Sequence, residues 1–321
     1  MSRLFQPVIL LILFCALVFG LLLPLNFEKP RFFNSEVKTT IESYGNDDPA
    51  YNLYKYQLEN RDFSNKELGW FFQIPNKTLT QFLPVGFEYP PHTLSGLLQV
   101  PRIYLNSVPI GLDKLPVAEK KAIFIRLMLP LILEANQEIW NQRHIFLNTK
   151  KSVNFSEVKR LAKIYKIDED TYDSHEMFHL LEKKVLPIPT SLALAQAAIE
   201  SGWGTSRFST EGNALYGQWS WSPKSGIKPL DASNSQAFVQ SFPNLKSSVR
   251  SYMRNLNTHF AYKEFRNLRI SYIKKGKWPD GLALASALYP YAETGDEYVE
   301  SIKNIILQNN LQRFDYSMLV N

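Results

Sequence analysis

The pattern of apolar and polar residues along the chain predicts a mostly helical protein with one small β region. Apolar positions recur at helical spacing over 115–142, where Pro130 is expected to kink or restart the helix, and again over 245–256 and 298–306. Between these helical blocks, 215–242 is rich in aromatic residues, Gly, Pro and Ser, with short alternation near its end. This composition predicts a small β-hairpin lobe within a helical domain.

A short buried helix is predicted over 190–201. Prolines precede it, four alanines and other small residues allow close packing, and Gly202 supplies the left-handed residue that ends a helix. Thr190 or Ser191 is expected to cap its start. Residues 294–297 form a capping-box pattern that predicts the start of the last helix.

The N-terminal segment, 1–27, predicts insertion in a membrane. Its apolar run from Val8 to Leu25 is just long enough to cross a bilayer, and Arg3 is the only charge. No small-residue cleavage pattern follows, which favours an uncleaved anchor over a cleaved signal peptide. The only cysteine, Cys15, lies inside this run, so the rest of the chain forms no disulfide.

Composition adds few constraints on function. With 45% hydrophobic and 21% charged residues, the 321-residue chain has the balance of a globular protein. The net charge of +6 would draw it modestly towards an anionic polymer, although ordinary solubility explains it as well. No cluster of Lys and Arg resembles a nucleic-acid footprint, so no nucleic-acid partner is expected.

Glu200 is the strongest candidate for chemistry because it lies in the last turn of the helix over 190–201. The partial negative charge of a helix C-terminus and an apolar setting both disfavour a carboxylate, so its pKa should rise. A carboxylic acid that stays protonated near neutral pH can donate its proton to a leaving glycosidic oxygen. Helix geometry alone favours a simpler interpretation, in which the glutamate only reaches solvent at a helix end.

Three ordered motifs resemble those of the glucosaminidases of glycoside hydrolase family 73. They are Glu-Ser-Gly-Trp-Gly at 200–204, Asn-Ala-Leu-Tyr-Gly at 213–217, and a Tyr-Ala pair followed by a second tyrosine at 291–298. Within that family the chain resembles the Bax-like branch, judging by residues 127–136, 218–221 and 252–259. The likeness is strong over 187–310, weaker over 97–186 and absent before that.

This resemblance implies a lysozyme-like fold, in which a helical lobe and a small β lobe enclose a glycan cleft. Glu200 would be the general acid, and Tyr291 would position the substrate or stabilise the reaction centre from across the cleft. The implied substrate is the β-1,4-linked glycan of peptidoglycan, with no cofactor and no metal. With the N-terminal anchor, we expect a single-pass protein of the inner membrane whose catalytic domain lies in the periplasm.

The chain departs from the family pattern where a second carboxylate is expected on the β lobe. Asp231 is the only acidic residue between Gly212 and Tyr262. It is the candidate for a second catalytic residue, although a structural role in its loop fits equally. The N-acetyl group of the substrate could instead attack the anomeric carbon, which needs no enzymic nucleophile. A third possibility is an inactive protein that only binds peptidoglycan.

Several residues near the motifs are candidate contacts for the glycan, because flat rings stack on the apolar faces of sugars. Trp219 and Trp221 share one parity of the expected strand and would face the same side. Trp203, directly after the helix, is expected to be core. The candidate substrate-binding residues are Asn213, Tyr216, Trp219, Trp221 and Tyr289.

A competing motif, His175-Glu176-Met177-Phe178-His179, fits the pattern in which two histidines hold zinc and a glutamate activates water. It would make the protein a zinc peptidase, although histidines on a helix surface explain it more simply.

The sequence as a whole predicts four regions. They are an anchor over 1–27, an aromatic-rich spacer over 28–110, a helical region over 111–186 that packs on the catalytic domain, and a glucosaminidase-like catalytic domain over 187–321.

Overall fold

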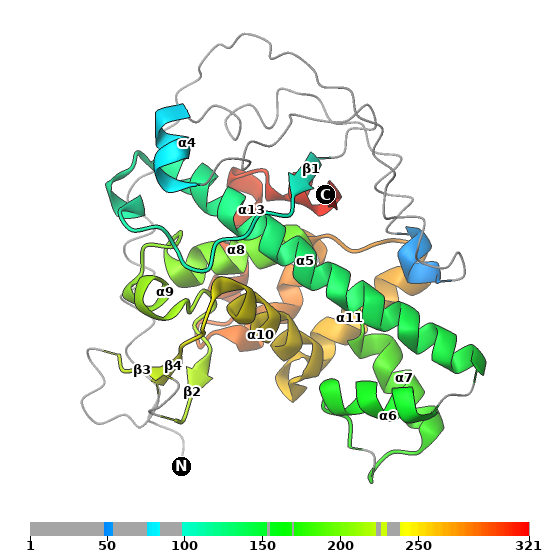
Figure 1. Ribbon diagram of the computed structural model, residues 1–321. Coiled ribbons are helices and arrows are strands. Elements are labelled where there is room, and N and C mark those ends of the chain that lie inside the picture. The colour runs from blue at the N-terminus through cyan, green and yellow to red at the C-terminus, as the bar shows by residue number, and fades with distance from the viewer. Residues whose placement is uncertain are drawn as a thin grey trace.

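The structure is a computed structural model that describes residues 48–53, 76–83, 98–152, 155–168, 170–222, 226–229 and 238–320. This part of the chain is mostly helical, as the apolar pattern predicts, and it has two small sheets (Figure 1), of which the sequence predicted only the one within 215–242. Its helices, with η marking 3-10 helices, include α4 (Asn76–Phe82), η3 (Leu112–Lys114), α5 (Val117–Ser152), α6 (Phe155–Ile164), α7 (Ser174–Lys184), α8 (Thr190–Ser201), α9 (Arg207–Gly212), α10 (Leu245–Thr258), η5 (Phe260–Tyr262), α11 (Lys263–Lys274), α12 (Gly281–Ala285), η6 (Ser286–Tyr291), α13 (Asp296–Gln308) and η7 (Leu311–Tyr316). Its strands are β1 (Leu98–Pro101), β2 (Trp219–Ser220), β3 (Gly226–Ile227), β4 (Phe238–Gln240) and β5 (Ser317–Val320).

The long helix α5 crosses the molecule diagonally in Figure 1. One helix continues through Pro130 to Ser152, so the helix does not restart at Pro130 and it ends ten residues after the predicted end at Gln142. Proline removes one backbone hydrogen bond, but residues 122–133 are all buried, and α5 packs on both α8 and α10. Tertiary packing therefore outweighs the local cost of the proline.

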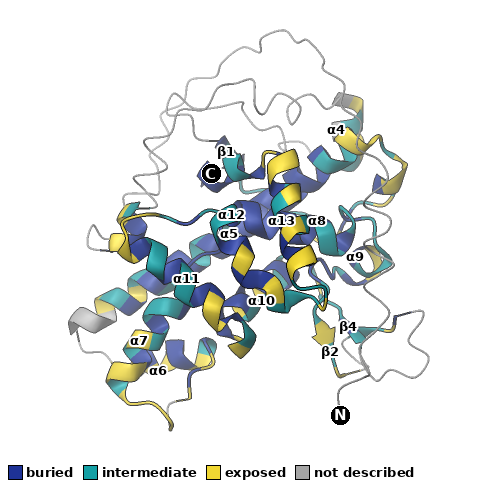
Figure 2. Cartoon of the chain, turned by 180° about the vertical axis from the view of Figure 1, so that it is seen from behind, coloured by how far each residue is buried: buried dark blue, intermediate teal, exposed yellow. Residues whose placement is uncertain are grey.

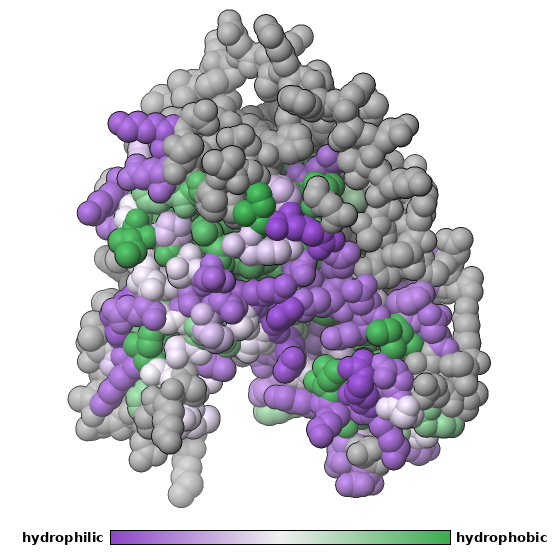
Figure 3. All heavy atoms as spheres, viewed as in Figure 1, coloured by the Kyte–Doolittle hydropathy of each residue, from purple (hydrophilic) through white to green (hydrophobic). Residues whose placement is uncertain are grey.

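The short helix α8 lies at the centre of the core. Every residue from Thr190 to Ala198 is buried, and α5, α12, α13 and η7 pack around the helix. Its small side chains allow these neighbours to approach closely, as the sequence predicts. Figure 2 shows buried residues along α5 and exposed residues on the outward sides of α10 and α13. Hydrophilic residues predominate over α6 and α7 on the face in Figure 3.

The predicted β lobe is present as an antiparallel sheet with strand order β2-β4-β3. Trp219 pairs with Val239 in the first ladder, and Gly226 pairs with Gln240 in the second. A separate parallel pair joins β1 to β5, so that Leu98 lies opposite Ser317 and the end of the described chain returns to the start of the helical region. The Asn213–Gly217 motif lies between the end of α9 and the start of β2, so it connects the helical part of the domain to this sheet.

Two expectations concern residues outside the described ranges. The N-terminal apolar segment over 1–27 is one of them, and Asp231 is the other. Among the described residues, no helix combines the length and apolar character needed to span a bilayer.

Candidate active site

Helix α8 places Glu200 one residue before the helix ends. Gly202 follows in the left-handed conformation with φ of 57°, and its N–H returns to the carbonyls of Ala198 and Ile199. The predicted stop at Gly202 is therefore confirmed. The expected cap by Thr190 or Ser191 is wrong, because Pro189 occupies the cap position without a side-chain hydrogen bond.

The cap of α8 comes instead from Asp315, which lies in η7. One Asp315 oxygen accepts from the Ser191 backbone N–H at 2.7 Å, and the other accepts from the Ser191 hydroxyl at 2.7 Å. Burial raises the pKa of Asp315 to about 7, against the lowering effect of the bonds from Ser191. The start of the helix that carries Glu200 is thus held by a side chain that is 124 residues away in sequence.

A tight turn follows Glu200 and sets the direction in which the chain leaves the helix. Gly202, Trp203 and Gly204 all have positive φ. The Ser201 hydroxyl accepts from the Gly204 N–H at 2.9 Å and donates to the Ala197 carbonyl. The indole of Trp203 packs edge to face on Phe124 with centroids 5.7 Å apart, which confirms that Trp203 belongs to the core.

Glu200 is partly exposed as a residue, and its carboxyl group accepts a hydrogen bond. The Tyr298 hydroxyl donates to Glu200 Oε1 at 2.8 Å. Burial raises the pKa of Glu200 to about 7, although the bond from Tyr298 acts in the opposite direction. The carboxyl group therefore retains its proton over much of the range up to neutral pH.

The second Glu200 oxygen, Oε2, faces Gly217. A side-chain carbon added to Gly217 would lie 3.0 Å from Oε2, which is closer than ordinary van der Waals contact. The backbone of Gly217 also has a φ of +60°, which favours glycine. Glycine at this position of the second motif therefore keeps a side-chain carbon from crowding this oxygen.

Tyr291 joins the motifs at 213–217 and 291–298. Its hydroxyl donates to the Tyr216 carbonyl at 2.8 Å, and its ring stacks on that of Tyr298 with centroids 5.4 Å apart. Burial, followed by the nearby Glu200 charge, raises the pKa of Tyr291 well above its usual value. Tyr291 is therefore a neutral phenol beside the partner of the candidate acid.

Tyr298 is the functional candidate that the sequence analysis missed. Its position at helical spacing with Ile302 and Ile306 marked it as core, and it is indeed 3% exposed. Its hydroxyl nevertheless reaches Glu200. The sequence feature that could have identified Tyr298 is its place as the second tyrosine of the motif at 291–298. The expected capping box at 294–297 is wrong, because α13 begins after Gly295, which has φ of 52° and no side chain to cap the helix.

The expectation that the Tyr216 ring lines the cleft is not met. The side chain is 1% exposed and stacks on Tyr252 with centroids 3.8 Å apart, so the ring belongs to the core. Asn213 ends α9 in the left-handed conformation and donates to the Phe242 carbonyl at 3.1 Å, which ties the motif to the chain after β4. Its buried Oδ1 has no hydrogen-bond partner among the described residues.

The other candidate glycan contacts are open to solvent. Trp219 is 49% exposed, Trp221 71% and Tyr289 54%. Their exposure leaves the ring faces available for stacking on a sugar. Among the described residues, no hydrogen bond or ring contact joins these three rings to Glu200. The segment that contains Asp231 lies outside the residues that the structure describes.

The His-Glu-x-x-His motif forms the first turns of α7. Glu176 accepts from the Asp173 N–H at 3.1 Å in a capping box that starts the helix. Both histidines are exposed, and their rings contact each other with centroids 4.5 Å apart. Within the described part of the chain, no three His, Cys, Asp or Glu side chains are grouped so that they could hold a metal ion. The motif thus has a structural explanation as a helix start.

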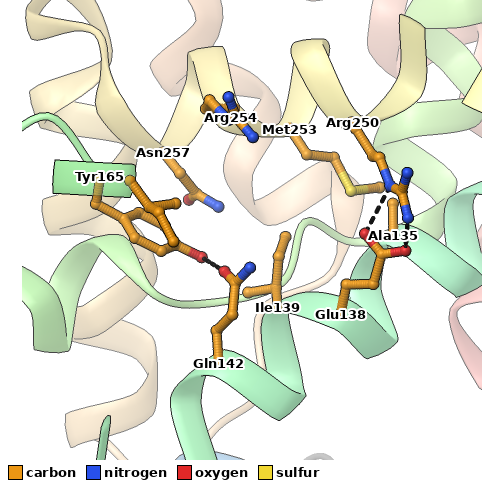
Figure 4. A pocket seen from close by; sticks show the side chains of 10 residues that line it. Ala135, Glu138, Ile139, Gln142, Tyr165, Arg250, Met253, Arg254 and Asn257 are labelled. Atoms are coloured by element: carbon orange, nitrogen blue, oxygen red, sulfur yellow. Dashed lines mark hydrogen bonds and ion pairs between the residues drawn. The ribbon is translucent and has the colours of Figure 1, made fainter. Parts of the chain in front are cut away.

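A separate pocket of about 220 Å³ opens between α5 and α10 (Figure 4). Its walls include the ion pair of Glu138 with Arg250 and the hydrogen bond from Tyr165 to Gln142 at 2.6 Å. Glu200 is not among its lining residues. Glu138 at the edge of this pocket is a member of a surface ion pair, which is the usual role of a charged residue on a helix surface.

The comparisons with known proteins agree with the resemblance read from the motifs. Residues 175–311 match the family model Glucosaminidase, described as mannosyl-glycoprotein endo-beta-N-acetylglucosaminidase. The chain is also 29% identical over 184 residues to Protein bax of Escherichia coli (strain K12). That match covers 56% of this chain and 66% of the relative, just under two thirds of its length.

A solved structure is similar as well. It is the catalytic domain of the autolysin Auto from Listeria monocytogenes, at 18% identity and a TM-score of 0.30, over 42% of this chain and 79% of that one. The matched family region begins at His175 in α7 and ends at Leu311, so it contains all three motifs and the whole Glu200 environment.

Proposed function

We propose that this protein is a peptidoglycan hydrolase of the endo-β-N-acetylglucosaminidase type, with Glu200 as the general acid and a lysozyme-like catalytic domain. The observation that carries the proposal is the environment of Glu200. Within a glucosaminidase-family domain, burial raises the pKa of this carboxyl group to about 7 while it keeps partial exposure. Such a group can hold a proton at neutral pH and deliver it to a leaving glycosidic oxygen.

Tyr291 is assigned a role beside the reacting bond. Its high pKa keeps the phenol neutral, and its bond to the Tyr216 carbonyl fixes the ring next to Tyr298. The exposed rings of Trp219, Trp221 and Tyr289 are proposed to bind the glycan strand by stacking. Removal of Trp221 should therefore raise KM with a smaller effect on kcat, since stacking binds substrate and transition state alike.

The proposal is tested by zymography on purified cell wall. The wild-type protein should clear the wall, and Glu200→Gln should reduce the rate roughly 10²- to 10⁴-fold, the usual contribution of a general acid. The matched control is Glu264→Gln, which changes an exposed glutamate on α11 and should clear like the wild type. Equal clearing by Glu200→Gln would show that another group is the acid.

The same assay separates the alternatives. Clearing that a chelator abolishes indicates the zinc peptidase, and binding of the wall without clearing indicates a non-catalytic peptidoglycan-binding protein. Mass spectrometry of the released fragments then identifies the bond cut, because the new reducing end is N-acetylglucosamine for a glucosaminidase. Asp231→Asn tests the second carboxylate: loss of activity supports an enzymic base, and retained activity supports attack by the substrate's own N-acetyl group.

The location of the protein is proposed from its first 27 residues. An apolar run of this length with a single charge is expected to anchor the chain in the inner membrane, with the catalytic domain in the periplasm beside its peptidoglycan substrate. Cell fractionation and protease digestion of spheroplasts test this placement. A catalytic domain that stays protected in intact spheroplasts would contradict it.

A further inference from the structure

A chain of hydrogen-bonded side chains leads from α10 through α8 and α13 to the candidate acid. The Tyr252 hydroxyl donates to Gln196 Oε1 at 2.7 Å, Gln196 Nε2 donates to the Tyr298 oxygen at 2.9 Å, and Tyr298 donates to Glu200 Oε1 at 2.8 Å. Tyr252 and Gln196 are 0% exposed and Tyr298 is 3% exposed. Water therefore has little access to the bonds between these three side chains.

The direction of these bonds is fixed at Tyr252. Among the described residues, Gln196 Oε1 is the only hydrogen-bond partner of the Tyr252 hydroxyl. A buried hydroxyl without an acceptor is costly, so the Gln196 amide is held with its oxygen towards Tyr252 and its NH₂ towards Tyr298. An amide NH₂ can only donate, so the Tyr298 oxygen must accept from it.

The same direction continues to Glu200. Since the Tyr298 oxygen accepts from Gln196, the single Tyr298 proton is available for Glu200, and Oε1 receives it. Oε1 is therefore the acceptor oxygen of the carboxyl group, and the acid proton lies on Oε2. The opposite orientation of the Gln196 amide would leave the Tyr252 proton without an acceptor and would place the acid proton on Oε1, facing Tyr298.

We infer that Tyr252, Gln196 and Tyr298 are positioning residues that hold the acid proton of Glu200 on Oε2. The inference rests on the proposed role of Glu200 as general acid and names the atom that delivers the proton. Oε2 is the oxygen beside Gly217, where a side-chain carbon would lie only 3.0 Å away. Proton donation breaks the Oε2–H bond and forms the O–H bond of the leaving sugar as the glycosidic C–O bond breaks. Water or the N-acetyl oxygen of the substrate then bonds to the anomeric carbon. Glu200 is left as a carboxylate that the Tyr298 hydroxyl stabilises.

The test is a measurement of the Glu200 titration that does not depend on activity. In the full chain carrying ¹³C-labelled glutamate carboxyl groups, the Glu200 signal is assigned by its absence in Glu200→Gln. Tyr298→Phe removes the donor to the ionised form, so the pKa of Glu200 should shift upward by about one unit. Tyr252→Phe leaves every atom next to Glu200 in place, but it frees the Gln196 amide to turn.

In Tyr252→Phe, the turned Gln196 amide presents its oxygen to Tyr298 and accepts the Tyr298 proton. Protonated Glu200 can then also carry its proton on Oε1 and donate it to the Tyr298 oxygen. This added arrangement stabilises only the neutral acid, because the carboxylate has no proton to donate. The Glu200 titration should therefore shift upward in this variant too. The matched control is Tyr165→Phe, which removes one hydroxyl from another buried tyrosine, hydrogen-bonded to Gln142 outside the chain of four residues. It should leave the Glu200 titration unchanged, and circular dichroism checks that all three variants fold.

The pH dependence of the hydrolysis rate is the second measurement. A general acid must be protonated, so activity falls as pH rises through the pKa of the acid, and the alkaline limb should move to higher pH in Tyr298→Phe and Tyr252→Phe. If Tyr252→Phe titrates like Tyr165→Phe while Glu200→Gln abolishes hydrolysis, the positioning role is wrong and the proposed function stands. If the titration shifts but the wild-type protein cleaves no glycan, the hydrogen-bond chain stands and the proposed function fails.

Discussion

At the scale of single residues, the two oxygens of Glu200 have different surroundings. Oε1 accepts from a buried phenol, and Oε2 faces a glycine whose φ is positive. The sequence placed Glu200 at a helix end and predicted a raised pKa from the helix dipole and an apolar setting. In the structure, burial is the dominant cause, and the hydrogen bond from Tyr298 limits the rise.

Gly217→Ala should lower kcat/KM roughly tenfold to a hundredfold, because the new methyl group would lie 3.0 Å from Glu200 Oε2 and displace the reacting group. Gly276→Ala is the matched control. Gly276 has φ of +70° and no atom within 4 Å of an added side-chain carbon, so the change brings backbone strain without crowding. It should lower Tm slightly and leave kcat/KM of the folded protein unchanged. Equal kcat/KM in the two variants would show that the space beside Oε2 is not used.

The pH dependence of stability should change in Glu200→Gln. The pKa of Glu200 rises from its ordinary value of 4.5 to about 7 on folding, so the folded protein binds more protons than the unfolded chain between these values. The contribution of Glu200 to stability is therefore greatest below pH 4.5 and is lost as pH rises to about 7. Glutamine carries no charge, so the Tm of Glu200→Gln relative to the wild type should increase from pH 4.5 to 7 and then level off.

Thermal unfolding followed by circular dichroism checks this. Asp315, whose pKa is also raised to about 7, is present in both proteins and cancels in the difference. A Tm difference that is independent of pH would mean that Glu200 titrates normally and that its burial does not govern its charge.

At the scale of elements, the sequence predicted local features better than those that depend on distant residues, although the capping box expected at 294–297 is absent. The end of α8 at Gly202 and the apolar faces of α10 and α13 follow from neighbouring residues, and the structure has them. The start of α8 depends on Asp315, which no local pattern connects to Ser191. The burial of Tyr216 depends on its stacking with Tyr252 in α10, so a ring that seemed suited to a cleft belongs to the core.

The Asp315 cap should contribute to the stability of α8. Asp315→Ala leaves the Ser191 N–H without its partner in a buried position, which costs about 1–3 kcal/mol of the free energy of unfolding. Asp315→Asn keeps an acceptor oxygen of similar size and should cost less. Urea denaturation measures both variants. Equal midpoints for Asp315→Ala and the wild type would show that the carboxyl group does not hold the helix start.

At the scale of the whole molecule, the Glu200 site needs α8, α13 and α10 to keep fixed relative positions, and buried polar groups help to fix them. Arg269 on α11 is 0% exposed and donates to the carbonyls of Lys183, Leu186 and Pro187 and to Asn257 Oδ1. It thereby joins α11 and α10 to the segment between α7 and α8. None of these partners is a carboxylate, and burial lowers the pKa of Arg269 to about 9.

Arg269→Lys should destabilise the protein by roughly 2–4 kcal/mol, although it keeps a positive charge. A lysine ammonium on a flexible stem cannot reach four acceptors that a planar guanidinium reaches at once, and each buried acceptor left without a donor costs about 1–3 kcal/mol. The matched control is Arg160→Lys on α6, where the arginine pairs with Glu157 at the surface and the change should cost less than about 1 kcal/mol. Urea midpoints compare the two. The segment that Arg269 binds leads directly into α8, so the Glu200 titration should also broaden or shift in Arg269→Lys. A loss of stability that leaves this titration unchanged would show that the site does not depend on that connection.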